Sequence, residues 1–155
     1  MQRHNIIDLS PIELEKFCLK LDLKSFKAKQ IWNWIYCFGK TNFQEMTNLD
    51  INTRKLLEDC SFIYRPKINN VHISKDGTIK WLLEMDDKSL IETVFIPQGK
   101  RGTICISSQV GCTLNCTFCN TGTQKLVRNL TTSEILGQIF TVIDHLNDWP
   151  MGKTD

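Results

Sequence analysis

The sequence predicts a mixed fold: an α+β N-terminal region, with a three-helix cap and a small antiparallel β element, followed by the first β/α unit of a larger barrel-type domain. Apolar residues recur at helical spacing up to about residue 65, and β-branched residues cluster between turn signals over residues 66–98. A short apolar run, a long loop and one amphipathic helix follow over residues 99–155. We expect these three ranges to be separate domains or connectors.

Three helices are expected in the first range. Ser10 and Pro11 form an N-cap and a first helical position, and a second helix opens at Lys24–Phe26 and is ended by Gly39. A short piece at 43–46 precedes a third helix, capped by Asp50 or Asn52 and running through Cys60. No period recurs, so the pattern excludes a repeat array.

Three strands are expected next, at Ile68–Ser74, Thr78–Met85 and Ser89–Ile96, with hairpin signals at 75–77 and 86–88. Gly102–Ser107 reads as a short buried strand, and Thr131 or Thr132 caps a final helix. One β/α unit has no partner strand, and a full (β/α) barrel takes roughly 200 residues or more. The chain is therefore expected to stop inside a larger domain.

Composition narrows the class of protein. Of the 155 residues, 41% are hydrophobic and 23% charged, which excludes a disordered or low-complexity chain. No apolar run approaches the ~18 residues of a membrane span, and residues 1–5 do not resemble a signal peptide. We therefore expect a cytoplasmic protein without a membrane partner. The net charge of +2 is too small to identify a nucleic-acid partner by itself.

The chain has seven cysteines, an odd number without an export signal, which favours a reducing compartment. Cys18, Cys37 and Cys60 fall among helical apolar positions and are expected to be small buried hydrophobes. The other four lie close together, at Cys105, Cys112, Cys116 and Cys119.

The last three cysteines form a C-x3-C-x2-C pattern that predicts a metal site. Three thiolates on one loop can hold one face of an iron–sulfur cluster and leave one iron open. A zinc site would need a fourth ligand, and the nearest downstream histidine, His145, lies on the predicted final helix. Structural cysteines or a small zinc knuckle remain the alternatives.

With Phe118 before the last cysteine, the pattern resembles the C-x3-C-x-aromatic-C signature of radical S-adenosylmethionine (SAM) enzymes. Residues 91–97, 105–112 and 128–135 resemble the RlmN/Cfr family of RNA methyltransferases. Residues 26–32 and 76–81 extend the resemblance in the same order, closer to the RlmN branch than to the resistance branch.

The resemblance implies a radical SAM partial TIM-type barrel and methylation of carbon 2 of adenosine in 23S rRNA and in tRNA, 3′ to the anticodon. It implies a [4Fe-4S] cluster on Cys112, Cys116 and Cys119, with S-adenosylmethionine near Phe118. An external electron donor such as flavodoxin or ferredoxin and a monomeric protein are also expected.

Two further residues acquire roles only through the resemblance. Cys105 matches the thiol that resolves a protein–RNA crosslink by forming a transient disulfide, and Glu92 matches the acceptor of the carbon-2 proton. From the residues alone, Cys105 could be a core thiol and Glu92 a solvated strand carboxylate. The family's methyl-carrying cysteine has no counterpart after Cys119, so the chain is not expected to complete catalysis alone.

Residues 1–67 carry 11 basic and 8 acidic side chains, and an RNA contact is expected there. The candidate residues are Lys24, Lys27, Lys29 and Trp32. A solvated helix face is the alternative for this range. For the whole chain, the second hypothesis is a stand-alone RNA-binding, iron–sulfur or zinc module without catalysis.

Overall fold

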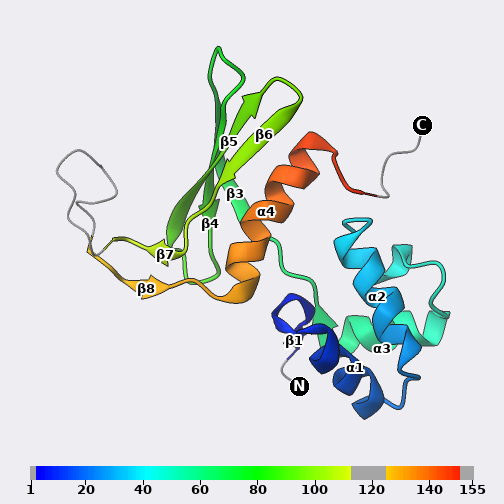
Figure 1. The fold of residues 1–155 in the computed structure, drawn as a ribbon. Coiled ribbons are helices and arrows are strands. Elements are labelled where there is room, and N and C mark those ends of the chain that lie inside the picture. The colour runs from blue at the N-terminus through cyan, green and yellow to red at the C-terminus, as the bar shows by residue number, and fades with distance from the viewer. Residues whose placement is uncertain (1–2, 113–124, 151–155) are drawn as a thin grey trace. The chain divides into compact units, whose positions relative to one another are not determined.

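The computed structural model describes residues 3–112 and 125–150. The chain divides into two compact units, residues 1–64 with 143–155, and residues 65–142. Figure 1 shows the short helices that make up the first unit and the antiparallel sheet of the second. The division gives a mixed α/β protein, as the sequence predicted.

The helical unit contains the three expected helices, α1 (Pro11–Lys20), α2 (Phe26–Tyr36) and α3 (Ile51–Cys60). Two 3-10 turns, η1 (Ile6–Asp8) and η2 (Phe43–Glu45), precede α1 and α3. Strand β1 (His4–Asn5) pairs in parallel with β2 (Ser61–Phe62), which joins the start of this unit to the end of α3.

Side-chain caps fix where these helices begin. Ser10 and Glu13 form a capping box at α1, in which each side chain accepts from the other residue's backbone N–H. Asp50, not Asn52, caps α3 and accepts from the Thr53 backbone N–H at 2.9 Å.

The core of the helical unit is apolar, with Ile31, Ile35 and Leu57 fully buried. Cys18 is also fully buried, and burial raises the pKa of its thiol to about 11, so it is uncharged at neutral pH. Cys37 and Cys60 are half-buried, so the expectation of buried cysteines is confirmed only for Cys18.

The second unit contains a four-stranded antiparallel sheet in the order β3–β4–β5–β6. Its strands are β3 (Lys67–Ile73), β4 (Ile79–Glu84), β5 (Leu90–Gln98) and β6 (Arg101–Cys105). The first two hairpins turn at Gly77 and Lys88, which have φ of 84° and 70°. The three strands expected from the sequence are confirmed.

The strand expected over residues 102–107 differs from its prediction. It is β6, and it is largely exposed at the edge of the sheet rather than buried. Only Gly99 and Lys100 connect β5 to β6, and a connection this short returns the chain antiparallel. A parallel strand of a barrel would need a crossover of a dozen or more residues.

Helix α4 (Thr132–Leu146) contributes to the core of the sheet unit. That core contains Trp81 and Leu83 of β4, Ile91 of β5 and Val142 of α4. Thr131 caps α4: its hydroxyl accepts from the Glu134 backbone N–H, and the Glu134 carboxylate accepts from the Thr131 backbone N–H. Figure 1 shows α4 running beside the strands.

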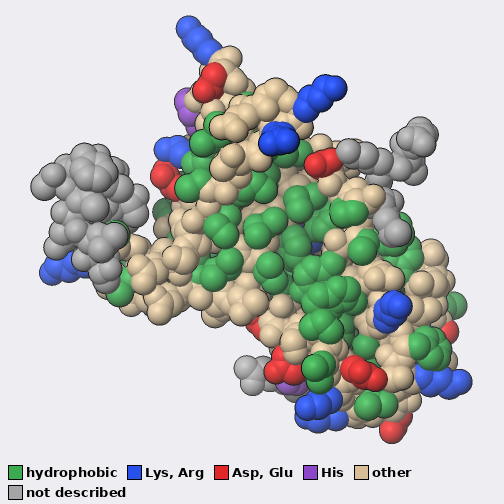
Figure 2. Space-filling view, in the orientation of Figure 1, with side chains coloured by type: hydrophobic (Ala, Val, Ile, Leu, Met, Phe, Trp, Pro, Cys, Tyr) green, Lys and Arg blue, Asp and Glu red, His purple; other side chains and the backbone are tan. Residues whose placement is uncertain are grey.

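Two hairpin tips of the sheet unit carry exposed cations, and at the first of them Asp76 follows Lys75. Figure 2 shows lysine and arginine side chains projecting at the top of the view, where the β3–β4 and β5–β6 hairpins end. These turns carry the exposed Lys75, Lys100 and Arg101. Within residues 3–112 and 125–150, no helix is long and apolar enough to span a bilayer.

Candidate active site

A short β ladder closes the base of the cysteine loop. Strand β7 (Gln109–Val110) pairs antiparallel with β8 (Arg128–Asn129), and Cys112 forms an isolated bridge with Lys125. The Val127 backbone N–H donates to the Val110 carbonyl at 2.8 Å. The described residues on either side of the loop, Cys112 and Lys125, are therefore held together.

Gly111 allows this close approach. Its φ is +77°, and a Cβ added there would lie 2.0 Å from the Lys125 carbonyl oxygen. That atom belongs to the backbone of the facing strand, so it cannot rotate away. Only glycine fits immediately before Cys112.

The structure describes Cys112, which is partly buried at the start of the loop. Cys116, Phe118 and Cys119 lie outside the described residues. In residues 3–112 and 125–150, no group of three or more His, Cys, Asp or Glu side chains could hold a metal. Three soft thiols on a loop with a closed base suit one face of an iron–sulfur cluster, so the donor set fits the implied group.

Arg128 ties this loop base to the rest of the sheet unit. Its guanidinium donates to both carboxylate oxygens of Glu134, at 2.8 and 2.7 Å, and to Asp87 at 2.7 Å. These contacts connect β8 with the N-terminus of α4 and with the β4–β5 turn. They lower the pKa of Glu134, with the Arg128 hydrogen bonds as the largest cause.

Replacing Arg128 with methionine should destabilise the protein by about 3 kcal/mol, because the buried Glu134 carboxylate loses its cation. The folded-state pKa of Glu134 lies below its unfolded value. Its contribution to stability is therefore complete above about pH 4.3 and is lost as the pH falls through the folded pKa. Thermal unfolding measured from pH 3 to 7 should show a smaller fall in melting temperature on acidification for the variant than for the wild type.

Arg101→Met is the matched control for this experiment, since Arg101 is exposed at the tip of the β5–β6 hairpin. It should leave the melting temperature nearly unchanged. Equal melting temperatures and equal pH dependence for Arg128→Met and the wild type would contradict a structural role for Arg128.

Gln138 of α4 is fully buried and joins the segments that carry Glu92 and Cys105. Its side-chain oxygen accepts from the Thr93 hydroxyl at 2.9 Å and from the Ser107 backbone N–H at 2.7 Å. Its amide nitrogen donates to the Ser107 carbonyl at 2.8 Å. Thr93 follows Glu92, and Ser107 lies two residues after Cys105, so this one amide holds the Thr93 side chain and the Ser107 backbone beside the two candidate residues.

The register of the sheet places Glu92 and Cys105 on the same face. Cys105 pairs with Val94, and directly paired residues point to the same side of a sheet. Glu92 lies two residues before Val94 on β5, so its side chain shares that face. The face opposite the apolar core therefore carries both residues that the resemblance singles out.

Both candidate groups are accessible. Cys105 is an exposed free thiol, so the alternative of a core thiol is wrong. The Glu92 side chain is 50% exposed and forms an ion pair with Lys80, at 2.9 Å between Nζ and Oε1. A lysine beside the carboxylate limits its orientation, although an exposed pair of this kind stabilises the fold by less than about 1 kcal/mol.

A hollow of about 520 Å³ connects Glu92 with the base of the cysteine loop. Its wall includes Leu82 and Glu92 on the sheet, Ser107, and Gln109 to Gly111 at the loop base. A second hollow, of about 360 Å³, continues over Lys80, His72 and Asn70. The first is large enough for a nucleoside-sized substrate.

The four candidate RNA contacts lie in the helical unit. Lys24 and Lys29 are exposed, whereas the Lys27 amine forms an ion pair with Asp50 at 2.6 Å. Trp32 stacks on Tyr36, with ring centroids 4.0 Å apart. Lys29 and Trp32 also line a hollow of about 400 Å³.

Sequence reasoning missed Lys80 and Gln138. Gln138 is a polar residue within the apolar stripe of its helix, and such a position is a signal for a buried hydrogen-bonding role. No sequence pattern indicated a role for Lys80, because lysines are common on the exposed face of a strand.

Comparison with known proteins begins with a family match. The family described as "Ribosomal RNA large subunit methyltransferase N-terminal domain" matches residues 4–63. Proteins named "Dual-specificity RNA methyltransferase RlmN" match over more of the chain. The protein of Rhizorhabdus wittichii is 52% identical over 124 residues, or 80% of this chain and 31% of that protein. That of Rhodospirillum rubrum is 46% identical over 146 residues, or 94% and 34%.

The chain is similar to RlmN proteins over the residues that these matches cover. It spans about a third of the length of these RlmN relatives. A solved radical SAM methyltransferase from Sphaerobacter thermophilus has a similar fold, with a TM-score of 0.85 and 32% identity. The similarity covers 97% of this chain and 44% of that one. The resemblance to RlmN stated from sequence motifs is therefore confirmed.

Proposed function

We propose that this chain is the N-terminal part of a radical SAM methyltransferase that methylates carbon 2 of adenosine in 23S rRNA and in tRNA. One arrangement carries the proposal: the closed base of the cysteine loop and Glu92 line one hollow, and Cys105 shares the sheet face of Glu92. The RlmN names and the radical SAM neighbour support the reaction class.

Cys112, Cys116 and Cys119 would hold the [4Fe-4S] cluster, with S-adenosylmethionine near Phe118. When bound, the two groups supply the radical chemistry that an unreactive aromatic carbon requires. In the proposed barrel, the cysteine loop and α4 belong to the first β/α unit. A flavodoxin or ferredoxin would supply electrons, and we propose a cytoplasmic monomer.

The proposed chemistry of this chain's own residues begins after the protein and the RNA are linked through a methylene group on a cysteine sulfur. The Glu92 carboxylate accepts the proton from carbon 2 of the adenine. The Cys105 thiolate then attacks the linking sulfur, and a disulfide forms as the carbon–sulfur bond breaks. The electron pair of that bond leaves with the carbon, which takes up a proton and becomes the methyl group.

Covalent trapping tests these roles in a protein completed with the rest of the family sequence. Cys105→Ala should accumulate a protein–RNA adduct, because no thiol is left to displace the linkage. Glu92→Gln should accumulate it as well, because an amide does not accept the carbon-2 proton. A denaturing gel with labelled RNA separates the adduct from free RNA.

Cys112→Ala is the matched control, because a lesion before the radical step should give no adduct. It should therefore release only free, unmethylated RNA. Normal methylation without adduct in both Cys105→Ala and Glu92→Gln would refute their assigned roles.

A further inference from the structure

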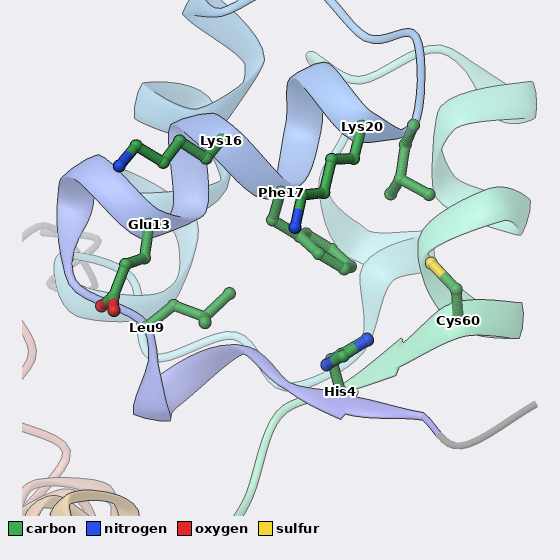
Figure 3. Close-up of a pocket in the computed structure, with 8 residues that line it drawn as sticks. His4, Leu9, Glu13, Lys16, Phe17, Lys20 and Cys60 are labelled. Atoms are coloured by element: carbon green, nitrogen blue, oxygen red, sulfur yellow. The ribbon is translucent and has the colours of Figure 1, made fainter.

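A hollow of about 500 Å³ lies within the helical unit, outside the candidate active site. Figure 3 shows Phe17 and Lys20 of α1 along one side, with His4 and Cys60 facing them. The lining comes from β1, from α1 with its flanking residues, and from the end of α3, which is distant in sequence from the first two. Its walls are therefore held by tertiary packing and not by one flexible loop.

On its α1 side, the hollow is lined by two lysines and one aromatic ring. Lys16, Phe17 and Lys20 recur at helical spacing, so they share one face of α1. Both lysines are exposed, and Phe17 is half-exposed. In Figure 3, the Lys20 amine lies beside the Phe17 ring, whereas the Lys16 amine points toward the Glu13 end of the hollow.

The opposite side of the hollow carries the Cys60 thiol and the His4 ring. The His4 ring meets Phe17 edge-on, with centroids 5.4 Å apart. Burial raises the pKa of the Cys60 thiol, so it is neutral at pH 7. Pairing of His4 with Ser61 keeps the histidine beside Cys60.

Among the residues that the structure describes, Glu13 is the one acidic residue that lines this hollow, and it belongs to the capping box of α1. Its carboxylate accepts from the Ser10 backbone N–H at 2.8 Å and from the Ser10 hydroxyl at 2.7 Å. These bonds lower the pKa of Glu13. In Figure 3, Glu13 lies at one end of the hollow and Lys20 extends over Phe17, so an anion is favoured on the Lys20 side.

We propose that this hollow binds one nucleotide of single-stranded RNA, with the base on the Phe17 ring and the phosphate at Lys20. Bases stack on exposed aromatic rings, and lysines pair with the phosphate backbone. The volume suits a mononucleotide. A flat ring beside a cation favours a nucleotide over an acidic peptide. This inference rests on the proposed function in one respect, which is that the partner is RNA.

Binding of a labelled single-stranded oligoadenylate to the 155-residue chain, followed by fluorescence anisotropy without cluster or S-adenosylmethionine, tests the site. Phe17→Leu should bind about tenfold more weakly, because stacking contributes about 1–3 kcal/mol per base. Phe17→Tyr should keep the wild-type affinity. Lys20→Gln should reduce the slope of log K against log salt concentration by about 0.7.

Lys55→Gln is the control, because Lys55 is exposed on α3 and does not line the hollow. It should retain more of the affinity than Lys20→Gln. Equal affinities for Phe17→Leu and Phe17→Tyr, or tighter binding of a polyglutamate peptide than of RNA, would overturn the proposal. Because the assay needs no methylation, its failure leaves the proposed reaction standing, and a failed reaction leaves this site standing.

Discussion

Replacing any one of Cys112, Cys116 and Cys119 with alanine should abolish the brown colour of the anaerobically reconstituted protein. Each thiolate would hold a different iron, and a cluster with only two protein ligands is not retained. Among the described residues, no group of three or more His, Cys, Asp or Glu side chains could hold the metal instead. Iron and sulfide analysis and the visible spectrum measure the effect.

Cys37→Ala is the matched control for the cluster experiment. Cys37 is a half-buried free thiol in the helical unit, so its removal should leave iron content and colour unchanged. A protein that binds one zinc, with metal content unaffected by the loss of Cys112, Cys116 or Cys119, would contradict the iron–sulfur assignment.

Gly111→Ala should open the base of the cysteine loop and reduce iron content. The added Cβ would collide with the Lys125 carbonyl, and alanine also resists a φ of +77°. The β7–β8 ladder must then separate or shift, at a cost of roughly 3 kcal/mol. Thermal unfolding and the iron-to-protein ratio after reconstitution measure the two effects.

Gly99→Ala separates the collision from the backbone strain. Gly99 also has a positive φ, 61°, but nothing lies within 4 Å of its added Cβ. This variant should lose only about 1–2 kcal/mol and keep its iron. If both variants bind iron equally, the closed loop base is not needed for cluster binding.

Local sequence signals predicted the helices and the first three strands well. Caps such as Ser10 and Asp50, and turns such as that at Gly77, act within a few residues and are visible in the sequence. The prediction that β6 is buried was wrong, because the apolar residues over 102–107 resemble those of a core strand. Its exposure depends on the edge position that the two-residue connection from β5 gives it.

The candidate site was predictable in its chemistry and not in its geometry. The spacing of Cys112, Cys116 and Cys119 predicts a metal site, and this stays a prediction because Cys116 and Cys119 lie outside the described residues. Glu92 and Cys105 share a sheet face only in this strand register, because a one-residue shift would turn one of the two side chains to the opposite face. Lys27 was expected at an RNA surface, yet its amine pairs with Asp50, a contact across 23 residues that no local pattern records.

The most direct test of the proposed reaction is the identity of the methylated atom. The complete protein, with its cluster reconstituted, would be incubated with S-adenosylmethionine, a reductant and either 23S rRNA or tRNA. The RNA would then be digested to nucleosides for mass spectrometry. We expect 2-methyladenosine, lost when Cys112 is replaced. A methyl group at another atom, or unmodified RNA from a protein with a full cluster, would contradict the assignment.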